Sequence, residues 1–291
     1  RDLARAKEFA EKWGFQKAYG SYEEMMKDPE VDVIYIATPH SFHYEQMMMA
    51  LDYGKGVICE KAFCINSSQA KEVRDHARKK GLFAAEAIWT RYMPSRKIIR
   101  DLIDEGAVGT PSVLTGNLFY PVVKKERLVK PELAGGALLD LGVYGINFAL
   151  MCFGNEIERM ESSVKMHPGG VDGMESITMF FKDGRMAVLT AGMYSRSDRK
   201  GIIHGDKGFM VVENINNPQS VSVFDEGYNL VKRIDFPEKV NGYEYEFEEA
   251  AAAFDSGKTE TESMPLDETV RVMELCDELR RQWKFRYPQE N

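Results

Sequence analysis

The chain of 291 residues is long enough for two domains, and its 44% apolar and 29% charged residues are typical of a globular protein rather than a disordered one. A net charge of −8 without any basic stripe argues against a nucleic-acid surface and against binding to anionic membranes, so a small neutral or weakly anionic ligand is expected. No run of about 18 apolar residues occurs, so no membrane-spanning helix is expected.

The first part of the chain, from residue 1 to about 108, alternates helical patterns with short apolar strands. Helices are predicted near 2–13, 21–28, 42–53, 67–80 and 94–105, and strands at 31–39, 57–60 and 82–89. Strands that are apolar on both faces, separated by helices, predict βαβ units in a parallel sheet. Because such crossovers are right-handed, the fold class is α/β with a doubly wound parallel sheet.

The pattern changes after residue 108 to longer, alternating strands with hairpin signals, of which Lys182-Asp-Gly-Arg185 is the clearest. Helices are predicted only at about 137–152, 241–256 and 266–284. This pattern predicts an α+β domain with a large open antiparallel sheet. We therefore divide the chain into a dinucleotide-binding domain (1–108), a substrate and oligomerisation domain (109–265) and a C-terminal helix (266–291).

The four cysteines, Cys59, Cys64, Cys152 and Cys276, stand at scattered positions. In a chain of this length they form neither a disulfide framework nor a zinc-binding pattern. We therefore expect a reducing compartment, the cytoplasm.

Polar or aromatic residues end all three strands of the first domain: Thr38-Pro-His-Ser-Phe-His43, Glu60-Lys61 and Trp89-Thr-Arg91. Ligands of open parallel sheets bind outside the carboxyl ends of the strands. A single Glu-Lys pair is more often a surface salt bridge than part of a site. Three polar strand ends in succession favour a ligand site at this edge of the sheet.

Two further pairs of residues could belong to such a site. Asp140 and Tyr144 are four residues apart, so in a helix they share one face and can act on one ligand. A buried helix, with Tyr144 in the core and Asp140 near a cap, remains an equal alternative. His40 and His43 have no nearby third ligand, so no metal site is expected.

Four motifs together give the chain a family resemblance. They are ATPHSFH at 37–43, ICEKA at 58–62, AIWTR at 87–91 and GGALLDLGVY at 135–144. With them the chain resembles the glucose-fructose oxidoreductase, inositol dehydrogenase and MocA family of NAD(P)-dependent oxidoreductases. Trp89, Arg91 and Tyr144 look most like its dimeric dihydrodiol dehydrogenase and D-xylose dehydrogenase branch.

The resemblance implies reversible hydride transfer between a nicotinamide and a sugar or cyclic secondary alcohol. Lys61 and Tyr144 are the candidates for moving the hydroxyl proton, with Asp140 orienting the substrate or the lysine, and the choice between the two stays open. The implied cofactor contacts are Arg1, Arg5, Thr38, Pro39, His40, His43, Glu60, Lys61, Trp89 and Arg91. The implied substrate contacts are Lys61, Trp89, Phe119, Asp140 and Tyr144. Trp89 and the aromatic pair Phe119-Tyr120 could form a flat apolar wall for a sugar ring or a cyclic diol.

Two departures from the family pattern lie at the nucleotide end. Ala62 stands where proline is usual after the lysine, so the backbone there is expected to differ. The family's first strand and glycine-rich turn are absent, so the sheet lacks its first βα unit and roughly 30 or more residues are expected before Arg1. Arg1 and Arg5 then follow the second strand, where an arginine suits the 2′-phosphate of NADP. NADP is therefore the expected cofactor, with NAD possible.

Two alternatives to an enzyme remain. A non-catalytic dinucleotide or sugar sensor would keep the fold, but it has no need of both Lys61 and Tyr144. A remnant that binds no cofactor would follow if the first unit were truly missing. In every case an open sheet face would leave apolar surface uncovered, so a homodimer or homotetramer is expected.

Overall fold

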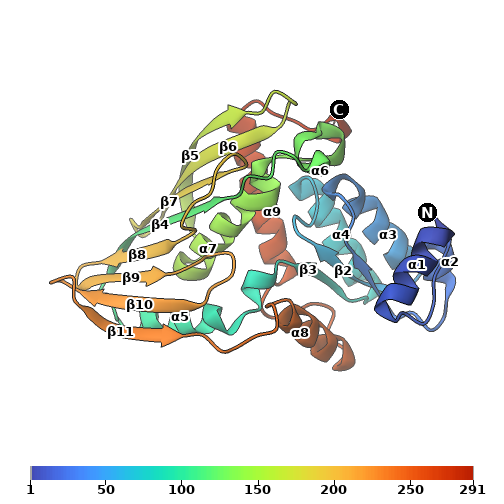
Figure 1. The fold of residues 1–291 in the computed structure, drawn as a ribbon, viewed down its shortest axis with the longest axis horizontal. Helices are drawn as coiled ribbons and strands as arrows, with labels where there is room; N and C mark the ends of the chain where they lie inside the picture. The colour runs from blue at the N-terminus through green and yellow to red at the C-terminus, as the bar shows by residue number, and fades with distance from the viewer. Residues whose placement is uncertain (1, 291) are drawn as a thin grey trace.

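A small parallel sheet and a large, mostly antiparallel sheet stand side by side in the computed structural model, which describes residues 2–290 (Figure 1). The helices are α1 (Leu3–Trp13), α2 (Tyr22–Lys27), α3 (His43–Asp52), α4 (Ser67–Lys80), α5 (Pro94–Asp104), α6 (Glu126–Val129), α7 (Val143–Phe153), α8 (Glu244–Asp255) and α9 (Leu266–Gln282). Each predicted helix is present, with ends that differ from the prediction by a few residues.

The parallel sheet has the order β1-β2-β3, with β1 at Val33–Ile36, β2 at Gly56–Glu60 and β3 at Ala84–Ala87. Helix α3 packs against β1 and β2. The apolar side chains of Phe83 and Ala85 contact Ala250 and Ala253 of α8, so a helix from the end of the chain also covers this sheet. Helices against an apolar parallel sheet confirm the predicted α/β class.

The large sheet has eight strands in the order β11-β10-β9-β8-β4-β7-β6-β5. They are β4 (Pro111–Phe119), β5 (Ile157–Met166), β6 (Asp172–Phe181), β7 (Met186–Gly192), β8 (Gly201–Gly205), β9 (Gly208–Val212), β10 (Ser220–Asp225) and β11 (Leu230–Asp235). The predicted hairpin at 182–185 joins β6 to β7. The predicted large antiparallel sheet is confirmed, with one parallel pair, because β4 enters between β7 and β8 and runs parallel to β7.

The helical segment before and including α7 forms the core between the large sheet and α9 (Figure 1). Residues Pro131–Phe153 are long and apolar enough to cross a membrane, with a mean hydropathy of 1.6, but 94% of their apolar window is buried inside the protein. Asp140 and several glycines interrupt the apolar run, so the sequence criterion did not single it out. A core helix of a soluble protein passes the same test.

The C-terminal helix α9 connects the two halves of the molecule. It packs against α4 and β3 on one side and against α7 and β5 on the other. Helix α8 lies in the predicted second domain but packs on the sheet of the first. The domain limits at 108 and 265 therefore stay predictions. The contacts of α9 also bring the carboxyl ends of β1 and β2 against the start of α7.

Candidate active site

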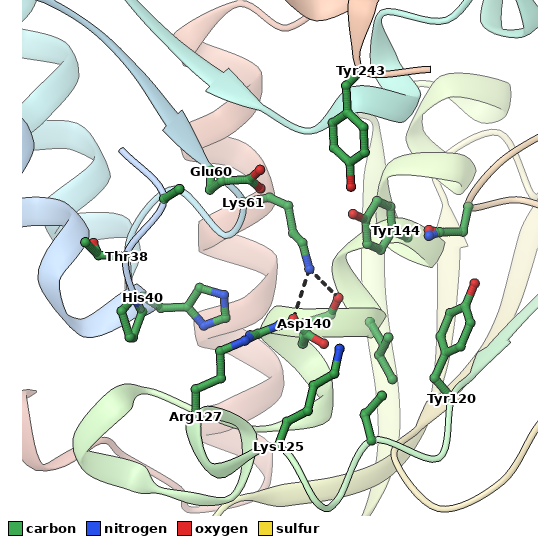
Figure 2. A pocket seen from close by; sticks show the side chains of 15 residues that line it. Thr38, His40, Glu60, Lys61, Tyr120, Lys125, Arg127, Asp140, Tyr144 and Tyr243 are labelled. Carbon is green, nitrogen blue, oxygen red and sulfur yellow. Dashed lines mark hydrogen bonds and ion pairs between the residues drawn. The ribbon is translucent and has the colours of Figure 1, made fainter. Parts of the chain in front are cut away.

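An open cleft of about 470 Å³ lies where the carboxyl ends of β1 and β2 face the start of α7 (Figure 2). Its lining includes seven of the residues predicted from the sequence: Thr38, Pro39, His40, Glu60, Lys61, Asp140 and Tyr144. The remaining lining residues are Ala37, Tyr120, Val122, Lys125, Arg127, Leu141, Asn216 and Tyr243, and of these only Tyr120 was expected, as part of an aromatic wall. The structure thus brings the two predicted groups of residues together in one cleft.

Lys61 and Asp140 meet at the centre of this cleft (Figure 2). Lys61 follows β2 directly, and its Nζ donates to the Asp140 carbonyl oxygen at 2.6 Å and to Oδ1 at 3.1 Å. Arg127 Nη1 donates to the same Oδ1 at 3.0 Å. Burial opposes ionisation of Asp140, but the charges of Lys61 and Arg127 outweigh it and hold the pKa of the carboxyl well below its usual range. Asp140 is therefore an anion that orients two cations.

The peptide bond between Lys61 and Ala62 is cis although residue 62 is not proline. The sequence predicted a different backbone here because Ala62 replaces the usual proline, and that prediction was wrong: the bond is cis without proline.

Tyr144 lies one helical turn after Asp140, across a π-helical turn at Leu138–Gly142. Its hydroxyl oxygen accepts a hydrogen bond from Trp89 Nε1 at 3.1 Å, and Lys61 Nζ lies 4.9 Å from its ring centre. Burial raises the pKa of Tyr144 well above its usual value, so the side chain is a neutral phenol. Within residues 2–290 no acceptor contacts its hydroxyl proton, which is free to bond a ligand.

Trp89 does not line the cleft but contacts two residues that do, Tyr144 and Tyr243. Its indole ring stacks on Tyr243 with ring centres 4.4 Å apart and an interplanar angle of 12°. Tyr243 precedes α8, and its ring forms part of the cleft. No local pattern identified Tyr243 because its position depends on α8 returning to the first sheet.

His40 and His43 hydrogen-bond to backbone carbonyl groups around the site. His40 Nδ1 lies 2.9 Å from the Ala134 carbonyl, and burial together with the charge of Lys61 lowers the pKa of His40 to about 3. His43 is fully buried between the carbonyl oxygens of Thr38 and Ala62 and does not line the cleft. Within the described part of the chain, no group of three His, Cys, Asp or Glu could hold a metal ion.

Three other predicted site residues lie away from the cleft, and a fourth falls outside the part of the chain that the structure describes. Arg91 is buried and turned toward α9, where it pairs with Glu268. Phe119 belongs to a separate hollow beside β5 and β6, and Arg5 is exposed on α1. Arg1 lies outside the described residues. The strand-end motif identified the right segment at Trp89–Arg91, but the turn there points the arginine to the opposite side.

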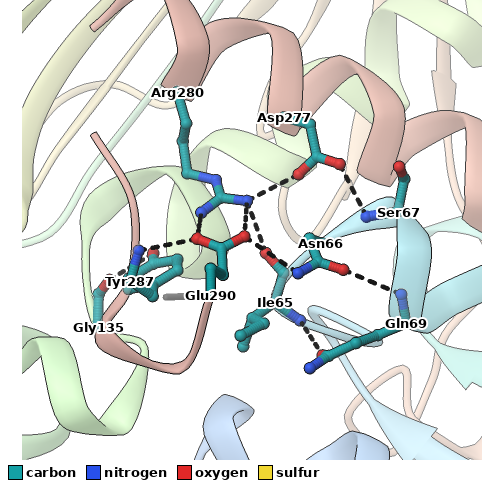
Figure 3. A network of polar contacts seen from close by, with 9 residues as sticks. All are labelled: Ile65, Asn66, Ser67, Gln69, Gly135, Asp277, Arg280, Tyr287 and Glu290. Atoms are coloured by element: carbon teal, nitrogen blue, oxygen red, sulfur yellow. Dashed lines mark hydrogen bonds and ion pairs between the residues drawn. The ribbon is translucent and has the colours of Figure 1, made fainter. Parts of the chain in front are cut away.

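The segments that carry Lys61 and Asp140 are both tied to the C-terminal tail (Figure 3). Arg280 of α9 donates to the Ile65 carbonyl at 3.0 Å and forms ion pairs with Asp277 and Glu290. The Tyr287 hydroxyl, fully buried, donates to the Gly135 carbonyl at 2.7 Å. One network therefore holds the segment that follows Lys61 and the turn that precedes Asp140.

The turn before Asp140 also needs a glycine. Gly136 has φ +122°, and a Cβ there would lie 2.1 Å from Asp172 Oδ1. Asp172 Oδ2 in turn accepts the Leu138 N–H at 2.5 Å, which caps the first turn of the helical segment. The Gly-Gly sequence thus allows a buried carboxylate to fix the start of the helix that carries Asp140.

The cleft fits a nicotinamide nucleotide by position and by chemistry. It opens at the carboxyl ends of two adjacent parallel strands, the usual nucleotide position in such sheets. Glu60 offers a carboxylate of which one oxygen is bonded to the Tyr35 hydroxyl at 2.5 Å, leaving the other for a ligand hydroxyl. Thr38, Pro39 and His40 would line the same side of the nucleotide.

Comparisons with known proteins agree with this geometry. The model of the oxidoreductase family with an NAD-binding Rossmann fold matches residues 1–87, and that of the GFO/IDH/MocA C-terminal domain matches residues 97–211. The trans-1,2-dihydrobenzene-1,2-diol dehydrogenase of Mus musculus is 32% identical over 301 residues, covering 100% of this chain and 89% of that protein. The Xenopus laevis enzyme of the same name is 34% identical over 298 residues, covering 99% and 89%.

Two solved structures share the fold. A 3-ketoreductase from Actinomadura kijaniata in complex with NADP and TDP-benzene has a TM-score of 0.89 at 23% identity, covering 96% of this chain and 86% of that one. An aldose-aldose oxidoreductase from Caulobacter crescentus has a TM-score of 0.86 at 19% identity, covering 97% and 87%. These matches confirm the resemblance drawn from the four sequence motifs. The chain belongs to the GFO/IDH/MocA family of oxidoreductases and is an NAD(P)-dependent dehydrogenase.

Proposed function

We propose that this dehydrogenase interconverts a secondary alcohol of a sugar or cyclic diol with the corresponding carbonyl compound, with NADP as the preferred cofactor. One observation carries the proposal: the Lys61 ammonium, held by Asp140, and the free hydroxyl proton of Tyr144 face the same cleft. The names of the relatives, which are diol dehydrogenases, support the substrate class.

The roles of the side chains follow from their contacts. When bound, the nicotinamide supplies or accepts the hydride. In the reduction direction Lys61 Nζ gives a proton to the carbonyl oxygen, and in the oxidation direction the proton returns to Nζ. Tyr144 donates a hydrogen bond to the same oxygen, and Trp89 keeps the phenol pointed toward it. Asp140 keeps Lys61 in place as the proton moves.

The preference for NADP rests on Arg1 and Arg5. Arg5 is exposed in the first turn of α1, and its backbone N–H donates to the Asp2 carboxylate. A guanidinium suits the 2′-phosphate because it pairs with phosphate oxygens in a two-pronged geometry.

Titration with NADPH and with NADH, followed by tryptophan emission, tests this proposal. Trp89 lies beside the cleft, and a Trp13→Phe background removes the emission of the exposed Trp13. Saturable quenching that is stronger with NADPH, together with turnover of a sugar or diol, supports the proposal. Quenching with neither cofactor overturns it, and binding without turnover of any alcohol favours a sensor.

The assembly and location are further parts of the proposal. Side chains on the outer face of the large sheet, among them Met174, Thr178 and Val188, are partly exposed, and a second copy would cover them in a homodimer or homotetramer. Sedimentation of the purified protein gives the mass of the assembly, and a monomer at micromolar concentration would exclude both. The cysteines, free and buried, support a cytoplasmic location.

A further inference from the structure

Two tyrosine hydroxyls in the cleft, those of Tyr144 and Tyr120, each accept a hydrogen bond from a neighbour that can only donate. Tyr144 accepts from the indole N–H of Trp89, and Tyr120 accepts from Arg199 Nη1 at 3.0 Å. An indole N–H and a guanidinium can only donate. Each phenol must therefore direct its own proton elsewhere, and across residues 2–290 neither has an acceptor. Both hydroxyls thus act as donors toward a ligand in the cleft.

The charged groups of the cleft also favour a ligand that accepts hydrogen bonds, because positive charges outnumber negative ones. Lys125, at the start of α6, and Arg127, within α6, point toward Asp140 (Figure 2). The cleft holds the cations Lys61, Lys125 and Arg127 against the carboxylates Glu60 and Asp140. Arg127 and Lys61 share one oxygen of Asp140. Lys125 has no partner within the described ranges of the chain, so its ammonium is the positive charge left over.

A set of donors with one surplus cation matches a group that only accepts hydrogen bonds and carries negative charge. Carboxylates and phosphate monoesters have both properties, whereas a neutral diol could accept these hydrogen bonds but would leave the positive charge of Lys125 without a counter-charge. We propose that the substrate is a polyol that carries an anionic group, a carboxylate or a phosphate monoester, bound by Lys125, Arg127 and Tyr120. Its reacting hydroxyl lies at Lys61 and Tyr144. This inference rests on the proposed dehydrogenase function and narrows its substrate class.

Matched pairs of compounds test the inference on the cofactor-loaded protein. D-glucose is compared with D-glucuronate and with D-glucose 6-phosphate, and D-galactose with D-galacturonate. Calorimetry measures binding to the NADPH-loaded protein, and kcat/KM measures turnover. We expect the anionic member of a pair to bind and react about tenfold better or more, by an amount that falls as salt rises. The uronates and the sugar phosphate distinguish the two sources of the charge.

A lysine pair adjacent in sequence supplies the matched variants. Lys125→Gln removes the unpaired cation, and we expect it to lower kcat/KM for the anionic compound about tenfold more than for the neutral one. Lys124→Gln makes the same change at an exposed lysine outside the cleft lining, and we expect no change in the selectivity.

Each other outcome overturns the inference in a recognisable way. Equal affinity and rate for both members of every pair would exclude an anion site while leaving the dehydrogenase function intact. If Lys125→Gln weakened NADPH binding and did not change the selectivity, the donors would serve the cofactor phosphate instead. If the NADPH-loaded protein turned over neither neutral nor anionic polyols, the proposed function would fail, and the inference with it.

Discussion

Two sets of side chains line the cleft, and they are held in opposite ways. In the first set, called the catalytic wall, His40, Asp140 and Tyr144 are each at least 94% buried, and each takes part in a hydrogen bond with another part of the protein. In the second set, called the loop wall, Lys125 and Tyr243 are exposed side chains on loops. The difference indicates that the structure fixes the geometry of proton transfer and leaves ligand choice to loop side chains, which can change without disturbing the core.

The largest expected effect comes from removing the proton carrier on the catalytic wall. Lys61→Met keeps the length and apolar stem of the side chain but removes the ammonium that contacts Asp140. We expect turnover to fall on the order of a thousandfold or more, because a positioned acid or base contributes about that much, while cofactor affinity stays within a few fold. Steady-state kinetics and the NADPH titration measure the two quantities. The control is Lys124→Met, and retained turnover in Lys61→Met would remove Lys61 from the mechanism.

A smaller loss is expected from the neighbouring phenol. Tyr144→Phe removes the donor to the reacting oxygen and leaves the Trp89 indole N–H without its acceptor. We expect kcat to fall about a hundredfold, with a loss of about 1 kcal/mol in the free energy of unfolding. Tyr120→Phe makes the same change in the loop wall, where we expect KM to rise and kcat to change little. A wild-type kcat in Tyr144→Phe, or equal kcat losses in both variants, would contradict the division between the walls.

The difference between the walls also explains what the sequence could predict. Glu60, Lys61 and Thr38 were predictable because the carboxyl ends of parallel strands meet at one edge, whatever the loops do. Asp140 and Tyr144 were predictable as a pair because a four-residue spacing places them on one face of a helix.

Local sequence patterns could not identify Tyr243 and Lys125 as loop residues of the cleft. Tyr243 reaches the cleft only because α8 packs back on β3, and the place of Lys125 depends on how the chain leaves β4. Of the expected aromatic pair Phe119-Tyr120, only Tyr120 lines the cleft. The charged run Lys-Lys-Glu-Arg at 124–127 was visible in the sequence, but such a run is first interpreted as a solvated surface. Arg91 shows the converse: its motif was visible, yet its side chain pairs with Glu268 on the far side of the turn.

A change of intermediate size tests whether the C-terminal network sets the geometry of the catalytic wall. Tyr287→Phe removes only the hydrogen bond to the Gly135 carbonyl, five residues before Asp140. We expect a loss of about 1 kcal/mol in stability and a fall in kcat of about three- to tenfold with KM little changed. Kinetics well below the unfolding temperature separate the two effects. Tyr228→Phe, at a 79% exposed tyrosine on the β10–β11 hairpin, is the control. Lost stability with an unchanged kcat would reduce the network to a structural role.

The smallest expected effect concerns a buried acid behind the catalytic wall. Glu246 of α8 is 1% exposed, and neither carboxyl oxygen has a hydrogen-bond partner in the described part of the chain. Burial, with the charge of Glu60, raises the pKa of Glu246 from 4.5 to about 8. The folded state therefore keeps a proton that the unfolded state releases, so this group lowers the free energy of unfolding as pH rises from about 5 to about 8.

Glu246→Gln replaces the carboxyl with an amide of the same shape that does not titrate. We expect its free energy of unfolding, measured by urea denaturation at about pH 5 and about pH 8, to fall less with pH than that of the wild type. A residual slope should remain, because burial also raises the pKa of Asp172 to about 6 and that of Glu86 to about 7. Glu248→Gln, at an exposed glutamate two residues along the same helix, should leave the slope unchanged. Parallel curves for Glu246→Gln and the wild type would mean that Glu246 is ionised in the folded protein, and that the region behind Glu60 is as open to solvent as the loop wall.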